Sequence, residues 1–222
     1  MMDESDLTEK KSFPVWLIII IVVILLSALG ALGWWLYKNQ SQNSASTSSV
    51  GDQNAATSGW QTYKSASQGF SIIIPPNWKQ TESGVEGRVS FSSGDAPEGD
   101  APPTYPVTFA NIWSEANSEN LTAQGVIDAL KSNIQKSAVK DFKIELEEDV
   151  TINGVQGRKI VMSDSDLQTQ LSHVSGFACA VKNGKVYNIN FVATAKDAAA
   201  AKKTWNENSY LFDKMISAFI FL

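Results

Sequence analysis

The sequence predicts an α+β domain, an antiparallel β-sheet with helices packed on it, preceded by one N-terminal transmembrane helix. Three observations predict this. An uncharged apolar segment covers Val15–Tyr37, near the N-terminus. Further along, strand-like segments are joined by Asn153-Gly154 and by Asn183-Gly184, which are strong signals for two-residue hairpins. Two other segments carry apolar residues at helical spacing. The order of strands, helix, hairpins and helix favours an antiparallel sheet covered by its helices.

The composition excludes several classes of protein. The 222 residues are 43% hydrophobic and 18% charged, and their net charge is -5, with a pI near 4.9. An acidic chain argues against nucleic-acid binding, because such proteins are usually basic. The single cysteine, Cys179, excludes an intrachain disulfide framework and a multi-cysteine zinc site. The single histidine, His173, excludes a His-rich metal site.

Residues 14–37 are predicted to cross the lipid bilayer as one helix. Val15–Tyr37 has 23 residues, which makes about 35 Å of helix and spans a hydrocarbon core of about 30 Å. Pro14 suits a helix start. Trp16 and Trp35 match the aromatic belts at the two membrane surfaces. A cleaved signal peptide is the alternative, but the apolar run exceeds the usual signal core of about 7–15 residues.

Flanking lysines give this helix a direction. Lys10 and Lys11 precede it, whereas only Lys38 follows it closely, and positive residues favour the cytoplasmic side. We therefore expect residues 1–13 to be a cytoplasmic tail and the C-terminal domain to lie outside the cytoplasm. Residues 38–59 are rich in Ser, Asn and Gln and lack apolar residues to bury, so they predict a disordered linker.

Residues 60–222 are predicted to form the exported domain, and its first half is mostly strand. Strands are expected at Gln61–Lys64, Phe70–Ile74, Arg88–Ser92 and Val107–Trp113. The pair Pro75-Pro76 ends the second strand, because proline cannot donate to a ladder. Trp78 is then expected to fold back and close the edge of the core. A long loop is expected at Gly94–Pro103.

A helix is predicted next. Ile127, Leu130 and Ile134 are spaced as i, i+3 and i+7 and form one apolar stripe. Thr122 is expected to be its N-cap. Asn120 opens a glycosylation sequon that ends at Thr122, but a capping role explains this threonine more simply.

The second half of the domain is predicted to contain hairpins and a final helix. Phe142–Glu148 alternates between apolar and charged residues, so Phe142, Ile144 and Leu146 are expected to face the core. The two hairpins join Val150–Ile152 to Gly157–Met162 and Gly176–Val181 to Val186–Val192. Lys196–Phe219 is expected to be helical, with a possible interruption near Asn206–Asn208.

Four segments, in the same order along the chain, resemble the PsbP-like domains, a family named for an extrinsic lumenal subunit of photosystem II. They are Phe70–Lys79, Thr151–Ile160, Gly184–Phe191 and Phe212–Phe219. The resemblance implies an α/β/α sandwich around an antiparallel sheet. It implies no catalytic site, because the family has no shared one to carry over. The predicted anchor and linker depart from the soluble lumenal subunit, so photosynthesis is not implied either.

The chemistry-bearing residues suggest no enzyme site. His173 and Cys179 are six residues apart on one expected strand, about 20 Å along an extended chain, too far for a catalytic pair. Asp164 and Asp166 are expected in a turn. A loop carries Asp95, Glu98 and Asp100, and four acidic residues form the polar side of a strand and its turn: Glu145, Glu147, Glu148 and Asp149.

We therefore expect a single-pass membrane protein with a non-enzymatic PsbP-like domain that binds or assembles envelope partners. No catalytic, cofactor-binding or metal-binding residue is assigned. The expected partners are the bilayer, through residues 14–37, and an unidentified envelope protein. Ser27 and Ala31 would allow two membrane helices to pack closely, so a homodimer is a further hypothesis. The alternatives are a hydrolase-type enzyme that uses Asp and Glu and a calcium-binding domain.

Overall fold

The computed structural model describes residues 59–81, 87–93, 104–137 and 139–222. The predicted tail (1–13), membrane helix (14–37) and nearly all of the linker (38–59) lie outside the described residues. So does the loop expected at 94–103. Within the described part of the chain, no helix is long and apolar enough to cross a membrane.

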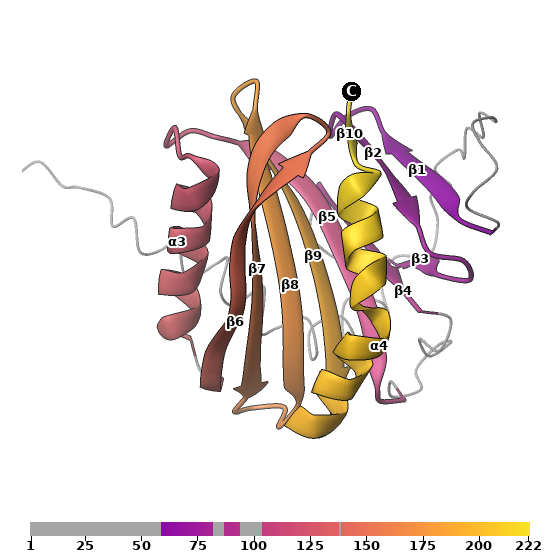
Figure 1. Ribbon diagram of the computed structural model, residues 1–222, viewed down its shortest axis with the longest axis vertical. Coiled ribbons are helices and arrows are strands. Elements are labelled where there is room, and N and C mark those ends of the chain that lie inside the picture. The colour runs from indigo at the N-terminus through magenta and orange to yellow at the C-terminus, as the bar shows by residue number, and fades with distance from the viewer. Residues whose placement is uncertain (1–58, 82–86, 94–103, 138) are drawn as a thin grey trace, which may run out of the picture.

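The described residues form two antiparallel sheets and two helices (Figure 1). The large sheet has seven strands in the order β3-β4-β5-β9-β8-β7-β6. These strands are β3 (Lys79–Thr81), β4 (Arg88–Ser92), β5 (Val107–Ala116), β9 (Lys185–Ala195), β8 (Ser172–Lys182), β7 (Val155–Asp166) and β6 (Val139–Ile152). The small sheet has the order β1-β2-β10, made by β1 (Gln61–Ser65), β2 (Phe70–Ile74) and β10 (Ile220–Phe221). The helices are α3 (Ala123–Gln135) and α4 (Ala198–Ser217).

The large sheet is covered on both faces. On one side of β9, Ile189 and Phe191 pack into a core that includes α4 residues and β2. On the other side, Val186 packs into a second core with α3 residues such as Ile127. Because successive side chains of a strand point to opposite faces, α3 and α4 lie on opposite faces of the sheet. This confirms the predicted fold class of an antiparallel sheet with packed helices.

Gly176 brings α4 close to the sheet. It lies on β8 opposite Phe191 of β9. A Cβ at this position would come within 2.5 Å of both Trp205 and Phe212. The aromatic rings of α4 therefore rest directly on the backbone of β8, and any larger residue would push the helix away from the sheet.

The small sheet packs beside α4, and the inner face of its strand β2 carries the residues that the sequence predicted. Phe70, Ile72 and Ile74 of β2 are buried, with 0–2% of each side chain exposed. The chain then turns at the two prolines, and Trp78 folds back to stack on Phe191, with ring centroids 5.7 Å apart. Only 8% of Trp78 is exposed. The predicted core role of this tryptophan is confirmed.

Local sequence signals placed both hairpin turns and one helix start correctly. Asn153-Gly154 joins β6 to β7, and Asn183-Gly184 joins β8 to β9. All four residues have φ between 43° and 76°, the left-handed region that such turns require. Thr122 caps α3, because its side chain accepts a hydrogen bond from the Gly125 backbone N–H.

The final helix differs from its prediction in two ways. Helix α4 runs without interruption through Asn206–Asn208, so the expected break is wrong. The Asn208 side chain donates to the Thr204 carbonyl at 2.8 Å and is thereby accommodated inside the helix. Phe219 lies beyond the end of α4, just before β10, although it is buried as predicted.

Of the three β6 residues predicted to face the core, Phe142 packs against the core beside α3 as predicted, whereas the placement of Ile144 and Leu146 is wrong. Ile144 is 40% exposed and Leu146 is 38% exposed. The register shifts between these two residues, which pair with Met162 and Val161 respectively. A bulge adds a residue on one strand and moves the following side chains to the other face. In addition, β6 is the edge of the sheet, where burial is incomplete.

The Trp78 contact is tested by replacement with alanine. We expect Trp78→Ala to lower the free energy of unfolding by about 3–5 kcal/mol, because it empties a buried aromatic site. Thermal unfolding of the full chain in detergent, followed by circular dichroism, measures the effect. Tyr210→Ala is the matched control, since Tyr210 is 62% exposed and surface substitutions change stability by less than about 0.5 kcal/mol. Equal melting temperatures for Trp78→Ala and wild type would contradict the core assignment.

Candidate functional site

The cysteine and the histidine both lie on β8. Cys179 is fully buried, and its Sγ donates to the Ala123 carbonyl oxygen of α3 at 3.5 Å. Burial raises the pKa of the Cys179 thiol to about 12, which outweighs the opposing effect of Arg158. A thiol with this pKa is protonated at neutral pH and is a poor nucleophile. His173 is six residues away on the same strand, as predicted.

A polar row crosses the strands on the α3 face of the sheet. Asp164, His173 and Thr194 are register partners on β7, β8 and β9. His173 Nδ1 and Thr194 Oγ1 share a hydrogen bond at 3.0 Å. Burial lowers the pKa of His173. Burial also raises the pKa of Asp164 to about 6, with a contribution from the charge of Asp166. The row thus brings together a carboxyl, an imidazole and a hydroxyl that are distant in sequence.

A second polar row lies on the same face. Ser90 donates to Asn111 Oδ1 at 2.6 Å, and Asn111 Nδ2 donates to Asn190 Oδ1 at 3.4 Å. All three residues are buried, and Asn190 also donates to the Gly176 carbonyl oxygen at 3.3 Å. Buried polar groups with such partners are satisfied. The sequence signal for this row was the asparagines inside the expected strands, but strand pairing was needed to connect them.

Asp164 and Asp166 do not form a turn, contrary to the sequence-based expectation, because β7 continues through both. The turn follows Asp166, whose Oδ1 accepts from the backbone N–H groups of Gln168 and Thr169, each at 2.7 Å. Asp166 and Asp197 line one surface depression at the end of β7. Asp197 is the N-cap of α4 and accepts from the Ala200 N–H at 2.8 Å. Both carboxylates of this depression therefore cap backbone groups.

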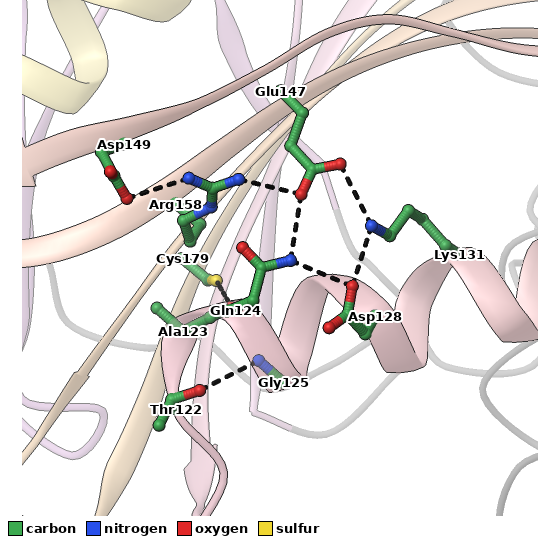
Figure 2. A network of polar contacts seen from close by, with 10 residues as sticks. All are labelled: Thr122, Ala123, Gln124, Gly125, Asp128, Lys131, Glu147, Asp149, Arg158 and Cys179. Atoms are coloured by element: carbon green, nitrogen blue, oxygen red, sulfur yellow. Dashed lines mark hydrogen bonds and ion pairs between the residues drawn. The ribbon is translucent and has the colours of Figure 1, made fainter.

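The strongest cluster of charges joins α3 to the sheet edge, and Glu147 of β6 is its centre. Figure 2 shows three donors pointing at its carboxylate. Gln124 Nε2 and Arg158 Nη2 approach Oε1 at 3.0 and 2.9 Å, and Lys131 Nζ approaches Oε2 at 3.1 Å. These hydrogen bonds lower the pKa of Glu147 to about 2, and the bond from Gln124 has the largest effect.

Two further carboxylates complete this cluster. Asp128 on α3 accepts from Gln124 at 3.0 Å and pairs with Lys131 at 2.8 Å. Asp149 on β6 pairs with Arg158 Nη1 at 2.9 Å. The cluster has six residues from three elements: Gln124, Asp128 and Lys131 of α3, Glu147 and Asp149 of β6, and Arg158 of β7. Only Glu147 and Asp149 among them were named from the sequence. Their contacts hold the helix against the edge strand.

A parallel cluster joins the other face of the edge to α4. Glu145 pairs with Lys202 at 3.1 Å. Lys159 of β7 pairs with Asp213 of α4 at 2.8 Å and with Glu148 of β6 at 3.1 Å. Hydrogen bonds lower the pKa of Glu145, and the bond from Lys202 has the largest effect. Both helices are therefore attached to the β6–β7 edge through ionised side chains.

Within the part of the chain that the structure describes, no group of three or more His, Cys, Asp or Glu side chains is placed to hold a metal ion. The acidic loop that carries Asp95, Glu98 and Asp100 lies outside the described residues. The calcium hypothesis for that loop stays a prediction.

Comparison with known proteins identifies the fold and no family. No protein-family model matches the chain, and no curated protein matches it. A solved structure of a mutant of the protein Mog1 matches with a TM-score of 0.52 at 10% identity, over 73% of this chain and 95% of that one. At this identity the likeness concerns the fold alone.

Two other solved structures are similar at lower scores. The solution structure of cyanobacterial PsbP from Synechocystis matches with a TM-score of 0.49 at 15% identity, over 79% of this chain and 98% of that one. LpqN, described as involved in cell envelope biogenesis of Mycobacterium tuberculosis, matches with a TM-score of 0.43 at 13% identity, over 71% of this chain and 87% of that one. A PsbP structure thus appears among the matches, and membership of the PsbP-like family stays a prediction.

The buried thiol is tested by its reactivity. We expect Cys179 in the native full chain to react with Ellman's reagent at pH 8 far more slowly than the same chain in guanidinium chloride, because burial keeps the thiol protonated and shielded. Absorbance at the usual thionitrobenzoate wavelength follows the reaction. Leu167→Cys supplies the matched comparison, since Leu167 is 55% exposed. Equal rates for the two thiols in the folded protein would refute the buried, protonated assignment.

The Glu147 cluster is tested by acid. Because its pKa is lowered from 4.5 to about 2 in the folded state, its stabilisation is present above about pH 4.5 and is lost as the pH falls towards 2. We expect Glu147→Gln to lower the free energy of unfolding by about 1–2 kcal/mol at pH 7, and the difference from wild type to shrink in acid.

Urea unfolding at neutral and acid pH measures this dependence. Glu119→Gln, at an exposed position, is the control and should follow wild type at every pH. A Glu147→Gln chain whose deficit is the same at pH 7 and pH 3 would show that the ionised carboxylate does not hold α3.

Proposed function

We propose that this chain is a single-pass membrane-anchored protein whose domain 60–222 is a non-catalytic, extracytoplasmic binding or assembly module for envelope partners. The anchor is residues 14–37, supported by the uncharged Val15–Tyr37 stretch and its aromatic ends. Residues 1–13 are placed in the cytoplasm by the lysine bias. The domain is further proposed to be a member of the PsbP-like family, supported by the four collinear segments.

One observation carries the non-catalytic part of the proposal: among the described residues, Glu147, Cys179, Glu145 and Asp213 make contacts that hold the helices on the sheet. A general acid or base works best with a pKa near the working pH. The pKa of Glu147 is near 2 and that of Cys179 is near 12, far from neutrality in opposite directions. Glu145 and Asp213 are held in ion pairs that fix α4. Each group would have to release a structural contact before it could react.

A second candidate, a hydrolase-type enzyme, is favoured by the Asp164–His173–Thr194 row. The pKa of Asp164, near 6, is suited to proton transfer. Against this, Thr194 is only 3% exposed, so its hydroxyl is closed to a substrate. His173 shares its Nδ1 hydrogen bond with that buried hydroxyl and not with a nucleophile at the surface. The binding module therefore explains the arrangement better.

Membrane topology tests the anchor. We expect the full chain in native membranes to resist alkaline carbonate extraction, because an apolar helix stays in the bilayer. Protease added to intact cells should remove the domain and leave an N-terminal epitope protected. A chain lacking residues 15–37 is the control and should be released into the soluble fraction. Extraction of the intact chain by carbonate, or protection of the domain in intact cells, would contradict the proposal.

The non-catalytic assignment is tested by binding. We expect affinity-tagged full chain, solubilised from native membranes, to retain the same envelope partner in wild type and in Asp164→Asn, since a binding module does not depend on that carboxyl. His173→Gln should behave likewise. Hydrolysis of an ester or peptide substrate by the wild-type chain, abolished by Asp164→Asn at unchanged stability, would favour the enzyme instead.

A further inference from the structure

The small sheet turns one face outward, beside α4. In the register of β1, β2 and β10, Lys64, Ser71 and Ile220 form a cross-strand row. Their neighbours along the strands, such as Phe70 and Phe221, point the other way into the core. Lys64 and Ile220 therefore share the outer face. Leu222 lies two residues beyond Ile220, and its N–H donates to the Gly69 carbonyl oxygen at 2.9 Å, which extends the same face.

Helix α4 continues this face. The Lys214 ammonium lies 4.3 Å from the ring centroid of Trp60, the residue that leads into β1. Tyr210 is one turn before Lys214 on the same side of the helix. Figure 1 shows α4 running alongside β10 and β2 towards the C-terminus. We call this region the C-terminal surface and define it by Lys64, Ile73, Tyr210, Lys214, Ile220 and Leu222.

This surface is unusually apolar for an exposed region. Ile220 is 50% exposed, Leu222 is 54% exposed and Tyr210 is 62% exposed. They make up half of the large exposed hydrophobic side chains of the described residues. Apolar side chains gathered on one face, with polar residues at its rim, mark a surface that is covered by something other than water.

The charges on this surface are positive. Lys64 and Lys214 lie on it, and Lys182 and Lys185 of the β8–β9 hairpin border it, with the Lys182 ammonium 4.6 Å from the Phe221 ring centroid. Strands β1, β2 and β10 contain no Asp or Glu.

The acidic residues lie elsewhere. Among the described residues, the recorded ion pairs gather on α3, α4 and the β6–β7 edge and include none of these four lysines. Two acidic residues of α4 lie near Lys214: Asp213 directly precedes it and pairs with Lys159 at 2.8 Å, and Glu207 is two turns earlier and faces Lys203 at 3.9 Å. The surface therefore complements an anionic partner.

The position of the preceding chain indicates which partner this is. The described part begins at Gly59, directly before Trp60 and β1, so the chain that leads to the proposed anchor joins the domain at this surface. A flexible linker of the length of residues 38–59 has an average reach of roughly 25 Å, about the size of a small domain. A bilayer that holds the proposed anchor would thus always be within reach of this surface.

We propose that the C-terminal surface docks on the anionic lipid surface of the membrane to which the chain is anchored. The proposal rests on the anchor proposed above. Ile220, Leu222 and Tyr210 would enter the boundary between headgroups and acyl chains, and the lysines would contact lipid phosphates, as in other interfacial protein surfaces. Docking would give the tethered domain one orientation towards its partners.

A fluorescent label reads out this contact. The full chain carrying Ile220→Cys is labelled with nitrobenzoxadiazole and reconstituted into phosphatidylcholine vesicles with or without phosphatidylglycerol. Leu167→Cys, at the turn that follows β7, is the matched site, since both residues are about half exposed. The chain without an added cysteine is the blank, because Cys179 is buried. We expect quenching of the Ile220→Cys label by aqueous iodide to fall several-fold in anionic vesicles and to recover in high salt, and the Leu167→Cys label to stay quenched.

Charge reversal supplies the second comparison. Lys64→Glu together with Lys214→Glu should restore iodide quenching of the Ile220→Cys label in anionic vesicles. Lys140→Glu together with Lys196→Glu makes the same change at two exposed lysines outside this surface and should leave the label protected. Equal loss of protection in both double variants would overturn the assignment of the contact to this surface.

Flotation of the vesicles separates the two proposals. A chain that floats with the vesicles while its Ile220→Cys label is quenched as strongly as the Leu167→Cys label overturns the docking and leaves the anchor. A chain that does not float overturns both. Protection that is the same in neutral vesicles and grows with the ratio of protein to lipid overturns lipid docking in favour of contact with a second copy.

Discussion

Burial of strand β9 on both faces is the constraint on which the rest of the domain depends. From Val186 to Ala195 every residue of β9 is buried. Residues of α4 and the small sheet pack on one face of β9, whereas on the other face α3 packs mainly on the neighbouring strands β7 and β8 and reaches the core that contains Val186 of β9. The need to exclude water from the α4 face also explains why α4 packs closely on Gly176, where its aromatic rings reach the sheet backbone.

Two-sided burial also explains where the charges are. The centre of the sheet accepts polar side chains only when their hydrogen bonds are satisfied, as in the Ser90–Asn111–Asn190 row. The ion pairs that attach the two helices lie at the β6–β7 edge, through Glu147 and Lys159. These charged groups attach the helices to the sheet, and the lowered pKa of Glu147 keeps that carboxyl ionised at neutral pH. A domain whose titratable groups are used in this way is suited to presenting a stable surface, which is the basis of the proposed binding role.

The parts of the fold that depend on short stretches of sequence could be predicted, and those that depend on strand pairing could not. The two Asn-Gly turns, the β2 strand with its following prolines, and the Thr122 cap are each specified within a few residues. Ile144 and Leu146 were misplaced because a bulge in β6 breaks the alternation, and nothing in the local pattern announces it. The Glu147 cluster joins residues from three elements, so it became visible only when α3 was placed against β6.

In the domain formed by the described residues, the carboxyl groups of Glu145, Glu147 and Asp213 attach the helices to the sheet edge. Carboxyl carbon chemical shifts, measured by NMR as a function of pH, test whether these carboxyl groups are structural. We expect Glu147 to stay ionised until about pH 2 and Asp164 to titrate near pH 6. If Glu147 instead titrates at its ordinary value of 4.5, the cluster that fixes α3 to the sheet edge is absent in solution.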